Sequence, residues 1–156
     1  MRLAWALFWA KRGDEAIAMA EASGDRSVEV RAGLIGSALV AAGRMDEARR
    51  LADELAAEDL DNSGLLQVAR LYAKAGVPDR QIVLLKRRIE RIDNAPAELS
   101  DQDRRMARAA ARFTLAQACE TAGDGGNAYE QYYVAALEGH EASRDWLAQH
   151  ASGEQR

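Results

Sequence analysis

A glycine followed by a short polar turn punctuates the chain at four places, each time between two apolar runs with helical spacing. The four segments read AKRGDEA, AAGRMDEA, AKAGVPDRQ and ETAGDGGNA, and their glycines are Gly13, Gly43, Gly76 and Gly123. Glycine is favoured just past the end of a helix, where the backbone must turn left-handed. Each segment therefore predicts the turn of an antiparallel helix pair, and intervals of 30, 33 and 47 residues indicate a repeat with one insertion.

Apolar periodicity and capping residues between these turns predict an all-α fold of about nine helices and no strand. Pro78 suits the first turn of one helix, and Ser100 with Asp103 makes a capping-box pattern at the start of another. The predicted helices span residues 2–12, 14–23, 27–42, 45–58, 63–75, 78–92, 101–122, 125–138 and 141–150.

The length of 156 residues predicts one domain with a sizeable core, over residues 1–150. The net charge of −4 argues against a general attraction to nucleic acid or anionic lipid. The predicted repeat units are 1–26, 27–60, 61–97 and 98–140, followed by a capping helix at 141–150 and a flexible tail at 151–156.

Eight apolar residues, Leu3 to Ala10, open the chain and include Trp5, Phe8 and Trp9. The run is too short to span a bilayer, and no other segment is long enough. Charged residues follow at once, which disfavours a signal peptide. We therefore expect a first helix that is apolar nearly all round. Its aromatic residues would contact the rest of the chain, a partner, a second copy or, peripherally, a membrane.

The helix pairs resemble tetratricopeptide repeats. In the best-matched unit, Ile35-Gly36, Leu39 and Ala48 occupy the places of the family's Leu-Gly pair, mid-helix aromatic residue and second-helix alanine. The matching residues elsewhere are Val68, Ala69 and Tyr72; Leu115, Ala116 and Ala128; and, with a shorter turn, Trp5, Ala6, Trp9 and Ala16. The segment NAYEQYYVAALEGHEASRDWL also resembles a Sel1-like repeat. Both resemblances imply a right-handed α-solenoid of helix-turn-helix repeats.

The tetratricopeptide resemblance also implies a concave binding face built from the first helix of each pair. On that face Val40, Leu66 and Phe113 would form an apolar floor, and Arg70 and Lys74 a cationic wall, with Gln117 beside them. The expected function is a non-catalytic protein-interaction scaffold or adaptor that binds a partner protein or peptide with apolar anchors and some acid. A self-associating structural subunit, joined through Trp5, Phe8 and Trp9, is the first alternative.

Arg104, Arg108 and Arg112 recur every fourth residue and would lie along one side of a helix. A nucleic-acid or phosphate contact through this stripe is the second alternative, and pairing with nearby carboxylates is the competing interpretation. No catalytic, cofactor-binding or metal-ligating constellation is expected. Cys119 is expected to be a buried inert thiol. A single cysteine favours a reducing compartment, so the cytoplasm is expected, with the periplasm as the alternative. The Ala- and Arg-rich composition suggests a bacterial source.

Overall fold

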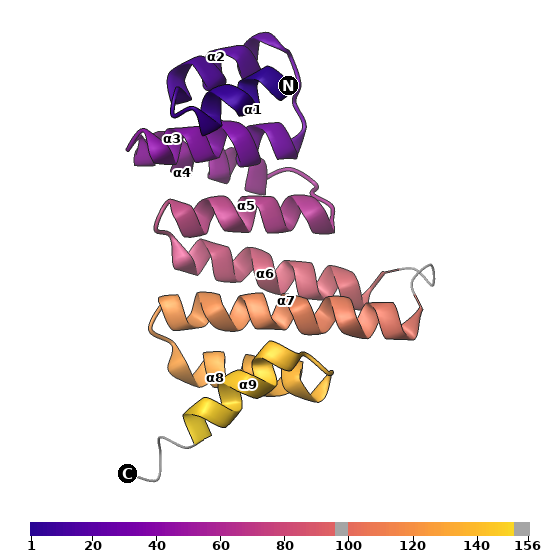
Figure 1. Cartoon of the computed structure of the whole chain (residues 1–156). Coiled ribbons are helices and arrows are strands. Elements are labelled where there is room, and N and C mark those ends of the chain that lie inside the picture. The colour runs from indigo at the N-terminus through magenta and orange to yellow at the C-terminus, as the bar shows by residue number, and fades with distance from the viewer. Residues whose placement is uncertain (96–99, 152–156) are drawn as a thin grey trace. The chain divides into compact units, whose positions relative to one another are not determined.

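The structure is a computed structural model that describes residues 1–95 and 100–151. Over these residues every regular element is a helix, as Figure 1 shows, so the all-α prediction is confirmed there. The elements are α1 (Arg2–Trp9), α2 (Gly13–Ala22), η1 (Glu29–Gly36), α3 (Ser37–Ala41), α4 (Met45–Ala56), α5 (Asn62–Lys74), α6 (Pro78–Asp93), α7 (Asp101–Thr121), α8 (Gly125–Leu137) and α9 (Glu141–Ala151).

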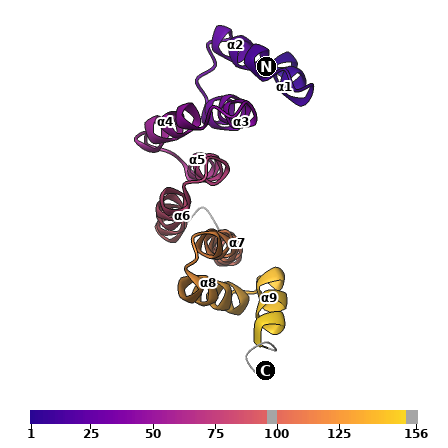
Figure 2. The ribbon, with the colours of Figure 1, turned by 90° about the vertical axis from the view of Figure 1, so that its left-hand side faces the viewer.

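The chain divides into two compact units, Met1–Gln81 and Ile82–Arg156, so that the division falls within α6. In the first unit α1 packs against α2, and the continuous η1–α3 helix packs against α2, α4 and α5. Figure 2 shows α1, α3 and α5 along one side of this unit, with α2 and α4 on the other. In the second unit α8 packs between α7 and α9.

One predicted boundary and most of the predicted tail fall on residues that the structure does not describe. The single domain over 1–150 and the repeat units within it stay predictions, and the predicted boundary between 61–97 and 98–140 lies outside the described residues. Of the predicted tail at 151–156, Ala151 ends α9 and the remainder lies outside the described residues. The cap of α7 is confirmed, because the Asp103 backbone N–H donates to Ser100 Oγ at 3.1 Å.

Five helices end in the same left-handed turn. The left-handed residues are Lys11, Gly43, Gly76, Gly123 and Gly139, with φ between 61° and 103°. After each one, the next backbone N–H donates to the carbonyl five residues back, as from Arg12 to Leu7 at 2.9 Å. This Schellman arrangement satisfies carbonyls that a helix end would otherwise leave unpaired. The glycine prediction is therefore confirmed at positions 43, 76 and 123.

The first turn differs from its prediction. Gly13 begins α2, and the left-handed position belongs to Lys11, with φ of 61°. The first helix accordingly ends at Trp9, where residues 2–12 were predicted. Counted from Lys11, Gly43 of the next such turn lies 32 positions later, and Gly76 lies 33 further on. The first helix pair is therefore in register with the others without a shortened turn.

The corrected register identifies the residues at the helix crossings. Seven positions before the left-handed residue of the first four of these turns stands a small residue, and these residues are Ala4, Gly36, Ala69 and Ala116, all buried. Five positions after it stands a buried alanine in three of the pairs, namely Ala16, Ala48 and Ala128. Counted from the left-handed residue of its turn, each of Trp5, Ala6 and Trp9 lies two positions after the equivalent of Ile35, Gly36 and Leu39, and Ala6 is exposed whereas Ala4 is fully buried.

The helix predicted over 27–42 is also more complex than expected. Its first part, Glu29–Gly36, is π-helical, and its last part, Ser37–Ala41, is α-helical. Gly33 and Gly36 lie in the π-helical part, where the absence of Cβ atoms lets the backbone widen and lets neighbouring helices approach closely. Both glycines contact a side chain from another helix of the first unit.

Candidate functional site

One side of the first unit is formed by α1, the η1–α3 helix and α5, and two contacts join these helices. The indole of Trp5 lies over Gly33, where a Cβ would be 3.7 Å from Trp5 Cη2. Lys74 Nζ donates a hydrogen bond to Ser37 Oγ at 2.8 Å. Because Gly33 and Ser37 are one turn apart on one helix, both contacts belong to a continuous surface. We call it the inner face, comprising Trp5, Phe8, Trp9, Gly33, Ser37, Val40, Ala41, Leu66, Arg70 and Lys74.

Three aromatic rings form the α1 side of the inner face. Trp5 and Phe8 meet edge to face with ring centroids 6.1 Å apart, and Phe8 and Trp9 do so at 5.2 Å. Trp5 and Phe8 are partly buried against the cluster of Ala4, Val30 and other core residues. Trp9, in contrast, is 75% exposed. A tryptophan so exposed, held by a packed neighbour, is available for contact with another molecule.

An apolar pocket of about 500 Å³ lies between the end of α1 and the end of α3. Phe8 and Trp9 form one wall, and Ala38, Ala41 and Ala42 form the other. The alanines leave room because their side chains stop at Cβ. The backbone turn at Lys11 and the first residues of α2 complete the lining. The volume falls in the range typical of sites that hold a small ligand or a large side chain.

The α5 side of the inner face is cationic. Leu66, Arg70 and Lys74 recur every fourth residue and so lie along one side of α5; Leu66 is half-buried and the two cations are exposed. Ser37, which accepts the Lys74 hydrogen bond, is a neutral buried hydroxyl. Within the described residues, no carboxylate lies within ion-pair distance of Arg70 or Lys74.

Charge is segregated between the two sides of the first unit. The inner helices α1, α3 and α5 contain no acidic residue, and η1 has only Glu29, at its first position. The outer helices α2 and α4 carry the acids Asp14, Glu15, Glu21, Asp46, Glu47, Asp53 and Glu54. The inner face therefore presents apolar groups and cations, and the outer side presents most of the negative charge of this unit.

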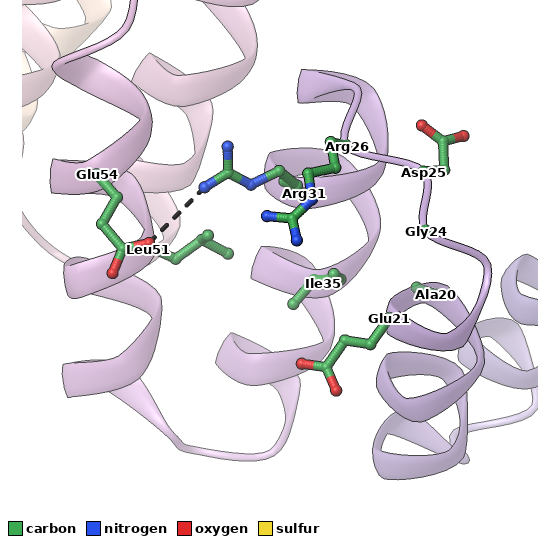
Figure 3. Close-up of a pocket in the computed structure, with 9 residues that line it drawn as sticks. All are labelled: Ala20, Glu21, Gly24, Asp25, Arg26, Arg31, Ile35, Leu51 and Glu54. Carbon is green, nitrogen blue, oxygen red and sulfur yellow. Dashed lines mark ion pairs between the residues drawn. The ribbon is translucent and has the colours of Figure 1, made fainter.

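The outer side also has a hollow, of about 320 Å³, between α2, η1 and α4, which Figure 3 shows. Of its two arginines, Arg31 has acidic partners within the protein. Arg31 pairs with Glu58 at 2.5 Å and with Glu54 at 3.7 Å, the pair drawn as a dashed line. Arg31 is thus held by internal ion pairs, which distinguishes it from Arg70 and Lys74 of the inner face.

Two of the predicted partner residues belong to the second unit, so the set predicted for one groove is divided between the units. The ring of Phe113 packs between Tyr132, at 5.6 Å, and His140, at 4.4 Å between centroids. Phe113 is thereby part of an aromatic cluster that continues from Tyr132 to Trp146, stacked at 4.1 Å. Gln117 is exposed on α7. The Nδ1 atom of His140 forms a hydrogen bond with Ser143 Oγ, 3.1 Å away, at the start of α9. The role of His140 there is therefore structural.

The arginine stripe of α7 is largely paired. Arg108 bonds to Glu138 and, at 3.0 Å, to Asp93. Arg112 donates to Gln131 at 2.9 Å and lies 3.8 Å from Glu138. Arg104 lies in a hollow lined also by Asp101, Gln102 and Arg105. Two of the three predicted anion contacts therefore have acidic partners within their own unit, in agreement with the competing interpretation of the stripe.

The thiol of Cys119 and the hydroxyls of two buried tyrosines are shielded from solvent or hydrogen-bonded. Burial raises the pKa of the Cys119 thiol above its usual range, which keeps it protonated. The Tyr72 and Tyr132 hydroxyls donate to Asp53 and Glu120, each at 2.6 Å, and burial raises both tyrosine pKa values. Among the residues described, no group of His, Cys, Asp and Glu side chains could hold a metal ion. The inner face offers apolar contact and positive charge.

Sequence reasoning placed Trp5, Phe8 and Trp9 apart from Val40, Leu66, Arg70 and Lys74, as a separate contact. The structure brings both sets onto the inner face. The position of Ala16 could have revealed this. Ala16 lies five residues after Lys11, just as Ala48 lies five residues after Gly43, so Lys11 is the residue equivalent to Gly43. In that register Trp5 is equivalent to Ser37, and Phe8 is equivalent to Val40.

Comparison with known proteins adds no further assignment. No family model matches the chain, and no curated protein matches it. Within the described residues, no helix combines the length and the apolar character needed to cross a bilayer.

Proposed function

We propose that this chain is a non-catalytic interaction module that binds a partner protein or peptide through the inner face of its first unit. The observation that carries the proposal is the continuity of this face across three helices, joined by the contacts of Trp5 with Gly33 and of Lys74 with Ser37. Such a rigid surface loses little conformational freedom on binding.

The proposal includes an architecture and a location. We propose that the helix pairs form a right-handed solenoid of the tetratricopeptide or Sel1-like type, because small residues recur at equivalent crossing positions after equivalent turns. A cytoplasmic location is part of the proposal, since the one cysteine is a buried free thiol.

Selection of a displayed library of random linear peptides on the purified full chain tests this function. Peptides that bind the wild-type chain are expected to lose binding to Trp9→Glu. The matched control is Leu137→Glu, since Leu137 is 69% exposed on α8 of the second unit. Both side chains are exposed, so the two variants should keep the wild-type fold by circular dichroism. Binders that tolerate Trp9→Glu but are lost in Leu137→Glu would overturn the proposal.

Self-association through α1 is a second candidate, favoured by the exposure of Leu3 on that helix, which is 60%. Light scattering at two protein concentrations separates it from the first proposal. A mass that rises with concentration in the wild-type chain and stays monomeric in Leu3→Glu supports self-association. A constant monomer mass in both contradicts it.

A further inference from the structure

We propose that the segment bound at the inner face is an acidic peptide with a large apolar anchor. The anchor enters the pocket beside Phe8 and Trp9, and carboxylates of the peptide meet Arg70 and Lys74 on α5. This inference rests on the proposed function and names the chemistry of the partner.

The pocket beside Trp9 is where the anchor fits. Its volume of about 500 Å³ is bounded by two aromatic rings on one side and by three alanines on the other. A Phe, Tyr, Trp or Leu side chain would cover the exposed Trp9 ring, and an aromatic one would gain edge-to-face contact with it. Burying large apolar side chains in such a pocket supplies most of the binding energy of typical interfaces.

The two cations of α5 favour a peptide that carries carboxylates. Lys74 bonds only to a neutral hydroxyl, and Arg70 has no ion-pair partner in the described part of the chain. Their hydrogen-bonding capacity is therefore available to a peptide carboxylate, as a charge-assisted hydrogen bond. The inner helices contribute no acid except Glu29 that would compete for these cations. An acidic peptide is thus attracted to this face, and a basic one is repelled from it.

The order of these features along the face gives the peptide a direction and a length. The pocket belongs to α1 and α3, and the cations belong to α5, which packs on the far side of the η1–α3 helix. Packed helices lie about 8–10 Å apart, and the pocket lies between α1 and α3, so about one and a half spacings, or about 12–15 Å, separates the anchor from the acids. An extended chain covers that distance in about four or five residues.

A nucleic acid is disfavoured by the same charges. Within the described residues, Arg70 and Lys74 are the cations of the inner face without an ion-pair partner, and Asp14 at the start of α2, with a side chain 83% exposed, lines the pocket. A polyanion crossing the face would approach this carboxylate, while a peptide with its acids confined to the α5 end would not.

Sequencing the peptides selected on the wild-type chain tests the inference. Peptides lost in Trp9→Glu should be enriched in Asp and Glu and carry an aromatic or large aliphatic residue about four or five positions from these acids. Binding of the strongest one, measured by fluorescence anisotropy, should weaken about tenfold in the double variant Arg70→Gln/Lys74→Gln. The matched control is Arg26→Gln, an exposed cation of the outer hollow, which should bind as the wild type does.

The other outcomes of these experiments would overturn the acidic partner, the proposed function or both. Neutral or basic peptides that still depend on Trp9 would leave the proposed function intact and overturn the acidic partner. Absence of any peptide binder that depends on Trp9 would overturn both. A single-stranded oligonucleotide that binds more tightly than the peptides and is lost in Arg70→Gln/Lys74→Gln would identify a different class of ligand. A wild-type dimer that Trp9→Glu converts to a monomer would make a second copy the occupant.

Discussion

Gly36 lies where η1 and α5 of the first unit approach closely. A Cβ added at this position would lie 2.7 Å from both Cδ atoms of Leu71, a side chain that is itself buried. Leu71 would have to move within a packed core, which destabilises proteins by about 1–3 kcal/mol. The better helix propensity of alanine offsets less than about 1 kcal/mol of this.

We therefore expect Gly36→Ala to lower the free energy of unfolding by about 1–2 kcal/mol in urea titrations. Gly33→Ala is the matched control in the same helix. A Cβ there would meet the Trp5 ring at 3.7 Å, an ordinary contact, so its stability should be unchanged or slightly raised. Equal stability of the two variants would contradict the close approach at Gly36.

Lys11 occupies a backbone conformation that the other four turns reserve for glycine. A left-handed conformation costs a non-glycine residue about 1 kcal/mol, and glycine adopts it without that strain. Lys11→Gly is therefore expected to stabilise the chain by about 0.5–1 kcal/mol, measured as a higher midpoint of urea unfolding. Lys11→Ala removes the same charge and keeps the strain, so it should give no gain. A similar gain in both variants would assign the effect to charge.

At the scale of the helices, two buried tyrosines tie helix pairs together by the same kind of bond. Tyr72 of α5 donates to Asp53 of α4, and Tyr132 of α8 donates to Glu120 of α7. Burial and the acceptor carboxylate raise both tyrosine pKa values above the ordinary 10.0. Their contribution to stability is therefore complete below about pH 10 and is lost as the pH rises towards the raised values.

The double variant Tyr72→Phe/Tyr132→Phe is expected to lose about 0.5–1.5 kcal/mol per bond at neutral pH. Above pH 10.0 its stability should fall less steeply than that of the wild-type chain, because no phenol remains at these two positions to ionise on unfolding. Urea titrations at neutral and alkaline pH measure both effects. An identical alkaline slope in the two proteins would show that these tyrosines do not control it.

Glu138, the C-cap residue of α8, pairs with two arginines of α7, and its side chain is 13% exposed. Removing its charge would leave Arg108 with Asp93 alone and Arg112 without an acidic partner. Glu138→Gln should destabilise the chain by about 1–2 kcal/mol, since the guanidinium groups stay partly buried. Glu130→Gln, an exposed site on the same helix, should change the unfolding midpoint little. Equal changes in stability in the two variants would show that pairing with Glu138 does not stabilise Arg108 and Arg112.

The helices themselves were predictable, because apolar spacing and glycine turns act locally. The turns at Gly43, Gly76 and Gly123 are left-handed as predicted. The first turn was not predictable from propensity, since lysine rarely adopts the left-handed conformation and Gly13 stood two residues away. The π-helical geometry of η1 was also missed, because π-helices are rare and the apolar spacing used to predict helices does not distinguish them from α-helices.

At the scale of the molecule, the candidate site was predictable in its residues and not in its grouping. Leu66, Arg70 and Lys74 share one side of α5, as their spacing implied. Trp5, Phe8 and Trp9 were assigned to a separate contact because the first helix was aligned two residues out of register. Phe113 and Gln117 belong to the other compact unit, a division that the repeat pattern alone did not reveal.

The central claim is that α1, the η1–α3 helix and α5 bind a partner as one surface. Amide hydrogen exchange of the full chain, with and without the strongest selected peptide, tests it most directly. We expect slower exchange on binding in the last turn of α1, in α3 and in the last two turns of α5, and unchanged exchange in α4 and in α2 beyond its first turn. Slowing confined to α2 and α4, or to the second unit, would contradict the claim.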